Sequence, residues 1–343
     1  MGVKIYELCP ATELGFDALR GKALAIDAYL FLYQFLSTIR SRDGALLTDS
    51  KGQVTSHLVG LLSRTTNFMR QGIQPCYVFD GTPPKLKQAT IKARADIKKE
   101  AQRQYEEAAA VQDVEGMRKF ASRTSRLTKD MVEEAKGVIR ALGLPVVEAP
   151  SEGEAQAAYI AKQGDVWAVA SQDADSLLFG APRLVRNLTV SGKRKKPGTL
   201  IYEEISPQLI ELKKVLSHLN ITQEQLLVLA MLVGTDYNPG GVRGIGPNKA
   251  LKLVTQHGKN YATLFKEVKW DDHCDVGWRE LLDTFKTMPV TDKYDLKWRS
   301  PDQEALKKLL CDKHDFSEER VARAVSGLAS ERKARSQQTL GSF

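Results

Sequence analysis

The chain has 343 residues, a net charge of +8, 42% apolar residues and 27% charged residues. The length predicts two compact units or one large domain with additions, and the apolar fraction is sufficient for a buried core. Four scattered cysteines without a CxxC pair argue against a zinc or disulfide framework, and no apolar stretch is long enough to span a membrane. The N-terminus has no signal-peptide pattern, so we expect an intracellular protein without membrane contact. We also expect it to be a monomer.

The first part of the chain predicts a β-α-β unit. Residues 23–26 and 76–79 are short apolar runs, which are typical of buried strands in a parallel sheet. Between them, residues 53–71 carry apolar side chains at helical spacing, and Gly72 ends this helix.

A basic segment at residues 84–129 interrupts this pattern. It is dense in Lys and Arg, poor in apolar residues, and rich in Ala, Glu and Gln, which favour helix. Helices without a clear apolar face bury little, so we expect the segment to stand off the body. It could be a solvated pair of surface helices. Its position between strands that deliver carboxylates favours an insertion that embraces DNA.

The α/β alternation then resumes. The predicted elements are a helix at 129–142, a strand at 145–147, a helix at 153–163, a strand at 166–170, and helices that include 223–233 and 250–254. Residues 187–202 predict a β-hairpin with the basic run 193–196 at its tip, which could be a localisation signal, solvated charge or a phosphate contact. The polar tail from Arg332 is predicted to be disordered.

Carboxylates follow four of the predicted strands. They are Asp27, Asp80, the Glu148 and Glu152 region, and Asp173. The carboxyl ends of parallel strands meet at one edge of a sheet, so these acids would converge, and like charges brought together require cations. Any one of these acids alone could be a helix cap or a surface charge. Four unrelated helix caps, one after each of four strands, explain the whole set less well than a shared site does. The sequence therefore predicts a divalent metal site.

Three further acids join this set. Glu154 follows Glu152 by two positions, Asp175 follows Asp173 by two, and Asp236 lies just beyond the helix at 223–233. For Glu154 and Asp175, helix capping remains an alternative. With Glu152 as the acid of the third strand, the predicted group has seven carboxylates, namely Asp27, Asp80, Glu152, Glu154, Asp173, Asp175 and Asp236.

A glycine-rich turn follows Asp236. Gly244-Ile245-Gly246 precedes a helix that begins with Pro247, and free amides at such a turn face an anion, typically a DNA phosphate. Lys249 adds positive charge on the next turn. The pattern indicates a helix–hairpin–helix.

Five stretches of this chain resemble the signature blocks of the flap endonucleases, the structure-specific 5′ nucleases of DNA replication and repair. They are residues 25–28, 77–84, 148–155, 171–175 and 234–250. The resemblance implies an α/β fold with a central, mostly parallel sheet flanked by helices (a PIN-like 5′ nuclease fold), a helical arch and a helical C-terminal region.

It also implies a division of the chain into five parts. These are an N-terminal nuclease region at 1–83, the arch at 84–129, an internal nuclease region at 130–234, a helix–hairpin–helix and C-terminal helical region at 235–331, and a tail at 332–343.

The resemblance assigns roles to individual residues. Two Mg²⁺ ions per active site, replaceable by Mn²⁺, would be held by Glu152, Glu154, Asp173, Asp175 and Asp236, with Asp27 and Asp80 acting mostly through metal-bound water. Lys87 and Arg94 match the cations at the base of the arch that neutralise the scissile phosphate, although either alone could be an exposed side chain. Tyr33 matches an aromatic residue that stacks on a base, and a core tyrosine is the alternative.

The resemblance implies further contacts elsewhere in the chain. Gly2 matches the family's mature N-terminus beside the active site, and Arg64 matches a DNA contact. Gly241, Val242 and Ile245 would bind K⁺ through their carbonyls, although the turn here is one residue longer than the commoner pattern. Gln337, Leu340 and Phe343 resemble the motif by which replication proteins bind the sliding clamp (PCNA).

The expected function is cleavage of branched DNA with a 5′ flap, with 5′-3′ exonuclease activity, in Okazaki fragment processing and repair. The location would be the cytoplasm or nucleoid in a prokaryote and the nucleus in a eukaryote. One alternative is a repair nuclease of the same family that acts on bubbles or four-way junctions. A non-catalytic junction binder would have lost one or more of the acids, and a phosphatase would have no use for the hairpin and the arch.

Overall fold

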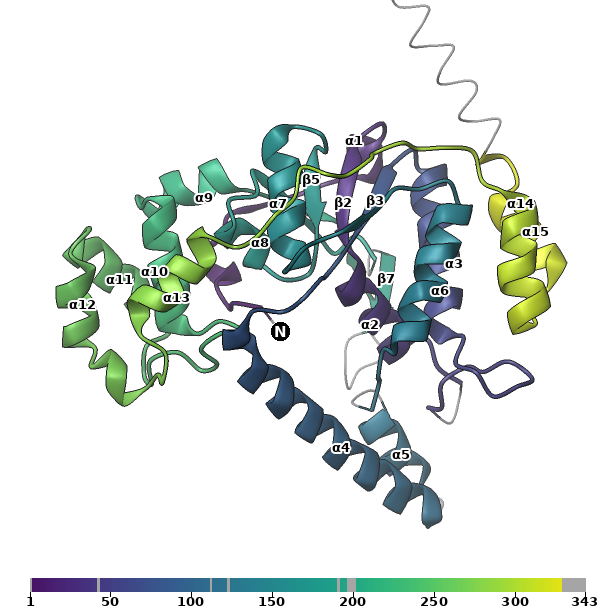
Figure 1. Cartoon of the computed structure of the whole chain (residues 1–343), viewed down its shortest axis with the longest axis horizontal. Helices are drawn as coiled ribbons and strands as arrows, with labels where there is room; N and C mark the ends of the chain where they lie inside the picture. The colour runs from purple at the N-terminus through teal and green to yellow at the C-terminus, as the bar shows by residue number, and fades with distance from the viewer. Residues whose placement is uncertain are drawn as a thin grey trace, which may run out of the picture.

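A seven-stranded sheet forms the centre of the computed structural model, in the order β1-β9-β6-β5-β2-β3-β4 (Figure 1). The structure describes residues 2–41, 44–111, 113–121, 124–189, 192–195 and 202–328. The strands of this sheet are β1 (Ala11–Glu13), β2 (Ala23–Asp27), β3 (Gln74–Phe79), β4 (Val146–Glu148), β5 (Ala168–Ala170), β6 (Arg183–Arg186) and β9 (Gln208–Glu211). Strand β9 runs antiparallel to both of its neighbours, and the other pairings are parallel. The predicted mostly parallel sheet is confirmed.

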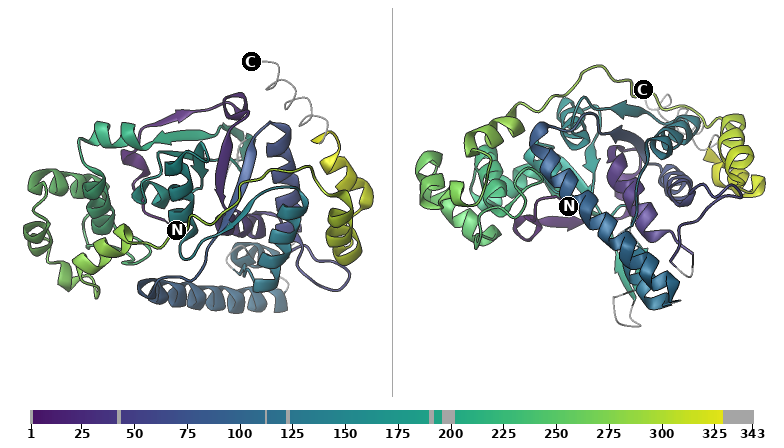
Figure 2. Two further views of the ribbon diagram at one scale, coloured as in Figure 1. Left: turned by 45° about the horizontal axis from the view of Figure 1, so that its top comes forward. Right: turned by 60° about the horizontal axis from the view of Figure 1, so that its bottom comes forward.

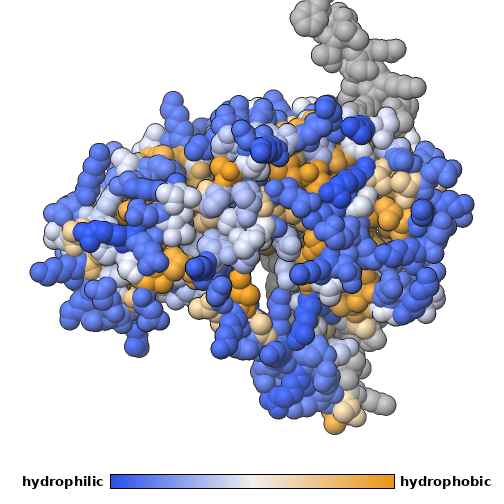
Figure 3. Space-filling view, in the orientation of Figure 1, coloured by the Kyte–Doolittle hydropathy of each residue, from blue (hydrophilic) through white to orange (hydrophobic). Residues whose placement is uncertain are grey.

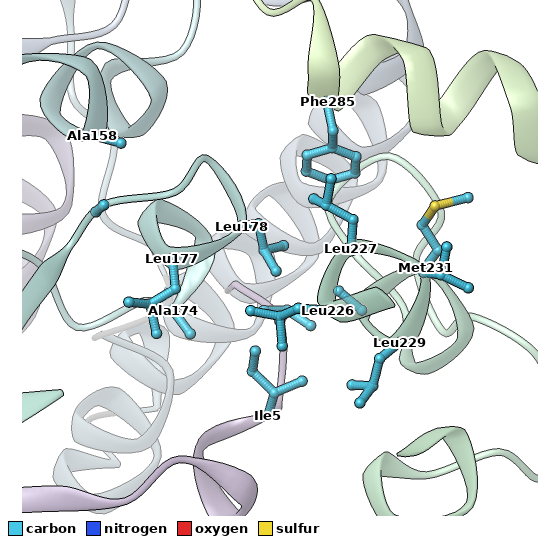
Figure 4. Close-up of a cluster of buried hydrophobic side chains, with 14 of the residues drawn as sticks. Ile5, Ala158, Ala174, Leu177, Leu178, Leu226, Leu227, Leu229, Met231 and Phe285 are labelled. Atoms are coloured by element: carbon cyan, nitrogen blue, oxygen red, sulfur yellow. The ribbon is translucent and has the colours of Figure 1, made fainter. Parts of the chain in front are cut away.

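Helices cover both faces of this sheet. One face packs against α2 (Ala28–Thr38), α3 (Ser56–Arg70) and α6 (Lys129–Ala141), and the other packs against α7 (Gly153–Gln163), with α8 (Asp175–Leu178) and α10 (Gln223–Val233) beyond it. Alternate residues of the inner strands enter different cores, because successive side chains point to opposite faces. In β2, Leu24 and Ile26 join the first core and Ala25 joins the second. Figure 4 shows the second core where Leu226 and Leu229 of α10 meet Ile5 and Leu177.

A helical hairpin projects from the body between β3 and β4. It consists of η2 (Lys85–Lys87), α4 (Gln88–Ala110) and α5 (Val114–Ala121), and α4 packs against α5 (Figure 1). The space-filling view shows a largely hydrophilic surface on this hairpin and an opening between it and the body (Figure 3). The segment stands off the body, as its composition predicts.

The remaining helices form two groups at opposite ends of the molecule (Figure 2). One group holds α9 (Leu212–Leu219), α11 (Pro247–His257), α12 (Tyr261–Glu267), η3 (Trp270–Asp272) and α13 (Trp278–Lys286). The other holds α14 (Gln303–Leu306), η4 (Lys307–Asp312) and α15 (Glu318–Val325), which pack against α3 and α6. Two short helices, η1 (Tyr6–Leu8) and α1 (Phe16–Leu19), lie near the N-terminus. Across the part of the chain that the structure describes, no helix has the length and apolar character needed to cross a membrane.

Several predicted boundaries differ from the structure. The helix predicted from residue 53 begins at Ser56, because Val54 forms a β-bridge with Thr48. The predicted hairpin consists of β7 (Gly192–Lys195) and β8 (Tyr202–Ile205), in a sheet of their own. The basic residues 193–195 lie within β7, where they pair with residues 202–204 of β8. Their predicted position at the tip of the hairpin is therefore wrong. The tail at 332–343 lies outside the described residues.

Candidate active site

Four adjacent strands deliver carboxylates to one edge of the sheet. The order β5-β2-β3-β4 is parallel throughout, so their carboxyl ends coincide. Asp27 is the last residue of β2, and Asp80 directly follows β3. Asp173 lies in the loop after β5, and Glu152 is the residue before α7. Backbone topology alone therefore brings together acids from distant parts of the sequence.

Backbone amides orient these carboxylates. Asp27 Oδ1 accepts a hydrogen bond from the amide of Leu30 at 3.0 Å, and Asp80 Oδ1 accepts from the amide of Gly153 at 2.6 Å. Asp27 therefore caps α2, and Asp80 is fixed at the start of α7. The rigid helix ends hold both side chains in place before any ligand binds.

The N-terminal segment orients the acids beyond β5. The amide of Val3 donates to Asp175 Oδ1 at 2.7 Å. A Cβ placed on Gly2 would lie 2.7 Å from Asp173 Cβ and 2.7 Å from Asp175 Oδ1, so position 2 has no room for a side chain. The predicted location of Gly2 beside the acids agrees with this contact.

Mutual proximity and burial raise the pKa values of the group. Burial raises the pKa of Asp27 to about 7, with a further contribution from Asp80. Burial also raises the pKa of Asp175 to about 7, with the charge of Asp173 adding to the effect. The pKa of Glu154 rises well above its usual range, through burial first and then through Asp175 and Asp27. Clustered carboxylates that resist ionisation indicate a site whose negative charge exceeds the positive charge that the protein places beside it.

The donor set fits a hard divalent cation. Carboxylate oxygens are the ligands that Mg²⁺ and Mn²⁺ prefer. Oε1 of Glu154 is buried and has no hydrogen-bond partner among the described residues, which leaves an acceptor free for a ligand. The pKa values of Asp80 and Glu152 are also raised, chiefly by burial. A bound cation would compensate charges that the protein itself leaves close together.

Side chains at the base of the helical hairpin enter the same site. Lys87 Nζ lies 2.5 Å from Glu152 Oε2 and 3.5 Å from Asp236 Oδ2. Arg94 Nη2 donates to Asp236 Oδ1 at 2.5 Å. Burial alone would lower the pKa of Lys87, but Glu152 and Asp236 raise it above its usual range, so its charge is secure at neutral pH. The hairpin therefore brings two cations to the carboxylates.

Tyr33 and Arg64 lie on α2 and α3, outside the acid group. Tyr33, in α2, is partly exposed, and the Nζ of Lys98 in α4 lies 4.3 Å from the centroid of its ring. It is therefore not a core tyrosine. Arg64 is exposed on α3, where a polyanion can reach it.

The glycine-rich turn forms a hairpin between α10 and α11. The amide of Val242 donates to the Leu232 carbonyl at 2.9 Å, which ties the turn to the end of α10. Gly246 is the residue before α11, and no side chain caps this helix. Lys249 is exposed on the first turns of α11. Uncapped amides and a nearby cation suit a phosphate.

The carbonyls proposed for K⁺ lie in the same turn. The Val242 carbonyl accepts a hydrogen bond from the amide of Ile245 at 3.0 Å, and Gly241 is buried with φ +55°. K⁺ binding by Gly241, Val242 and Ile245 stays a prediction. The clamp-binding residues Gln337, Leu340 and Phe343 lie outside the described residues.

One prediction was wrong, and one contact was not predicted. Glu148, expected among the converging acids, ends β4 but is exposed and lies 3.2 Å from Lys136 and 3.3 Å from Arg140, so it belongs to an ion-pair cluster on α6 and not to the acid group. Thr90, in α4, donates to the Asp236 carbonyl at 2.5 Å. A threonine within a polar helix carries no sequence signal for this contact.

Comparisons with known proteins agree with this geometry. Two family models match the chain, the XPG N-terminal domain at residues 7–101 and the XPG I-region at residues 143–236. Flap endonuclease 1 of Pyrococcus abyssi (strain GE5 / Orsay) is 52% identical over 343 residues, which cover 100% of this chain and 98% of the relative. The structure of flap endonuclease-1 from Methanococcus jannaschii is 44% identical with a TM-score of 0.73, and the match covers 95% of this chain and 98% of that chain. The catalytic core of Rad2 in complex with DNA substrate shares the fold at 22% identity, with a TM-score of 0.68 and coverage of 94% and 97%.

Proposed function

The chain belongs to the flap endonuclease family and is a nuclease, and we propose that it hydrolyses a phosphodiester at the base of a 5′ flap with the help of Mg²⁺. The observation that carries this proposal is the meeting of strand-end carboxylates with Lys87 and Arg94 from the helical hairpin. The carboxylates can hold a metal cation, and Lys87 and Arg94 can face the negative charge of a phosphate. The two kinds of group lie at one edge of the sheet, where together they suit a phosphodiester.

We assign the metal ligands to the acid group at the sheet edge. They are Asp27, Asp80, Glu152, Glu154, Asp173, Asp175 and Asp236. Two bound Mg²⁺ or Mn²⁺ ions would supply an activated water and charge stabilisation at the leaving oxygen. Asp27, Glu154 and Asp175 depend on such charge compensation, because each is buried beside other acids.

The side chains of the hairpin base bind and orient the scissile phosphate. Lys87 and Arg94 already lie against carboxylates, so their ammonium and guanidinium groups are held where negative charge gathers during hydrolysis. Tyr33 offers a partly exposed ring to a base at the same side of the molecule. These residues place the reacting bond without moving a proton themselves.

The duplex portion of the substrate binds at a distance from the acids. Gly244, Gly246 and Lys249 present amides and charge to one phosphate, and Arg64 on α3 reaches a further part of the backbone. The 5′ single strand passes through the opening between the body and the hydrophilic hairpin formed by α4 and α5 (Figure 3). The same arrangement allows 5′-3′ exonuclease activity, because a recessed 5′ end can occupy the same position.

Several finer assignments extend this proposal. We propose that the enzyme is an intracellular monomer in DNA replication and repair, and that its division into nuclease regions, arch and helical region follows the predicted boundaries. We also propose that K⁺ binds at the glycine-rich turn between α10 and α11, and that the tail motif recruits the sliding clamp. Deleting residues 337–343 should abolish stimulation by the clamp and leave basal cleavage nearly unchanged.

The test of the main proposal is cleavage of a labelled 5′-flap duplex. With Mg²⁺ the wild-type protein should release the flap near the junction, and EDTA or the Asp173→Ala substitution should stop cleavage while DNA binding persists. Wild-type protein that binds the flap but leaves it intact at saturating metal would show that the chain is a junction binder.

A further inference from the structure

Tyr6 makes a contact with the catalytic edge of the sheet that the proposed reaction does not use. Its hydroxyl donates to the backbone carbonyl of Gln172, the residue directly before Asp173. Tyr6 begins the short helix η1, so this bond joins the N-terminal segment to the loop after β5.

The ring of Tyr6 is held from its other side by Arg186. The guanidinium carbon of Arg186, the last residue of β6, lies 3.4 Å from the centroid of the Tyr6 ring. Cation–π contact at this distance fixes the plane of the ring and thereby the direction of its hydroxyl. Strand β6 pairs with β5, so the arginine and the acid loop belong to one rigid unit.

The rest of the segment reinforces this placement. Val3 and Ile5 are buried, and the Val3 amide donates to Asp175 Oδ1 at 2.7 Å. The backbone of Gly2 lies against Asp173 and Asp175 so closely that a Cβ has no room. Residues 2–6 therefore bind the loop of residues 172–175 at two points, through the Val3 amide and through the Tyr6 hydroxyl.

On the basis of the metal-dependent reaction proposed above, we propose that Tyr6 is a positioning residue for the metal ligands Asp173 and Asp175. It fixes the peptide before Asp173, as hydrogen-bonding partners of metal ligands do in other sites. Loss of its hydroxyl leaves this end of the loop with a weaker hold, chiefly the bond from the Asp173 amide to Ser171 Oγ at 3.1 Å, and the like-charged carboxylates then move apart. The consequence is a weaker metal site with an intact fold.

The test compares Tyr6→Phe, which keeps the ring against Arg186, with Tyr6→Leu, which loses both contacts. The matched control is Tyr294→Phe. The Tyr294 hydroxyl donates to Asp165 Oδ2 at 2.5 Å before the start of β5, at the opposite edge of the sheet. Direct Mn²⁺ binding to the DNA-free protein is measured from the electron paramagnetic resonance signal of free Mn²⁺, and the melting temperature is measured in EDTA.

We expect Tyr6→Phe to weaken Mn²⁺ binding about five- to tenfold and Tyr6→Leu to weaken it more, with the melting temperature in EDTA close to that of Tyr294→Phe. Excess Mg²⁺ should restore the single-turnover cleavage rate of Tyr6→Phe, and its KM for flap DNA should be unchanged. Mn²⁺ binding by Tyr6→Phe equal to that of Tyr294→Phe overturns the proposal. The proposal is also overturned if Tyr6→Phe has a lower melting temperature in EDTA and a slower cleavage rate that excess Mg²⁺ does not restore. Wild-type protein that binds no Mn²⁺ would instead refute the metal-dependent function itself.

Discussion

Arg94 donates to Oδ1 of Asp236 at 2.5 Å, although 142 positions of sequence separate the two residues. The bond joins the base of the helical hairpin to the loop that precedes the glycine-rich turn. Lys87 makes the corresponding contact with Glu152 at 2.5 Å. In the metal-free state the cations of the hairpin thus neutralise carboxylates that we assign to the metals, and substrate phosphate offers these cations a second partner.

The Arg94→Ala substitution should lower the single-turnover rate of flap cleavage by about 10²–10³, because one fixed charge that stabilises developing negative charge has an effect of this size. The affinity for flap DNA should change far less, since most of the binding surface lies elsewhere. Rapid-quench measurements at saturating enzyme give the rate, and fluorescence anisotropy in Ca²⁺ gives the affinity.

Arg103→Ala is the matched control for Arg94→Ala. Arg103 lies on the same helix, where it is exposed and pairs with Glu100 and Glu107. Its loss should leave the cleavage rate within about threefold, because exposed ion pairs contribute little. Equal rate losses in both variants would show that α4 contributes only general positive charge.

The Asp175→Asn substitution should stabilise the metal-free protein while removing cleavage. Asp175 is buried beside Asp173, and its amide replacement still accepts the hydrogen bond from Val3 without adding charge. At pH 8.5 in EDTA, we expect the melting temperature to rise by roughly 1–3 °C, which for a chain of this length corresponds to about 1–2 kcal/mol. Saturating Mg²⁺ should then raise the melting temperature of wild type and leave that of the variant unchanged.

Differential scanning calorimetry with EDTA and with Mg²⁺ measures these shifts. Asp295→Asn serves as a control, because Asp295 is exposed and pairs with Lys297, away from the acid group. A lower melting temperature for Asp175→Asn in EDTA would mean that repulsion within the acid group is not what limits stability there.

Much of the sheet edge could be predicted from the sequence, because it depends on chain topology. Apolar runs before Asp27, Asp80 and Asp173 indicate parallel strands, and parallel strands share the edge at which their carboxyl ends lie. The short strands β1, β6 and β9 were not predicted. At the edge of the sheet, the three residues of β1 are all exposed, and Ala11–Glu13 carry no hydrophobic alternation.

The contacts that complete the site were beyond sequence patterns. Glu148 follows an apolar run in the same way as the other acids, but α6 places Lys136 and Arg140 beside it. Tyr6 and Thr90 donate hydrogen bonds to the backbone carbonyls of Gln172 and Asp236. Every residue has a backbone carbonyl, so the amino-acid types do not indicate which one a side chain will contact. Such contacts depend on how elements pack, which spacing along the chain does not determine.

The stability of the metal-free protein should fall as pH rises from about 4 to about 7. Asp27 and Asp175 have pKa values of about 7 in the folded protein, against an ordinary value of 3.8 in the unfolded chain. The folded state therefore binds more protons than the unfolded state in this window, and stability decreases as these protons are released. Metal binding should show the opposite trend, because the ligands must be deprotonated.

Thermal unfolding from pH 5 to pH 8.5, with EDTA and with Mg²⁺, checks both trends. The stabilisation by Mg²⁺ should increase with pH and reach a plateau above about pH 8. In the Asp27→Asn/Asp175→Asn double variant, the metal-free melting temperature should depend less on pH. A metal-free protein whose stability increases steadily between pH 5 and pH 7 would contradict this account of the two aspartates.

The Gly246→Ala substitution should weaken DNA binding without affecting folding. Gly246 has φ −91°, which alanine adopts readily, and a Cβ added there would meet nothing within 4 Å. It also lies at the uncapped start of α11, where a methyl group would stand between the amides and a bound phosphate. We expect the affinity for flap DNA to fall about three- to tenfold, measured by fluorescence anisotropy in Ca²⁺, with the melting temperature unchanged.

Gly277→Ala provides the comparison, because Gly277 likewise precedes a helix, has φ −59° and has open space around its Cβ position. Its helix, α13, is not part of the glycine-rich turn, so DNA affinity should stay at the wild-type value. If both substitutions leave DNA affinity unchanged, the start of α11 does not hold a phosphate, and the helix–hairpin–helix must contact DNA through Lys249 and its neighbours alone. Equal losses in both would instead point to a general effect of alanine before a helix, which circular dichroism of the two variants would reveal.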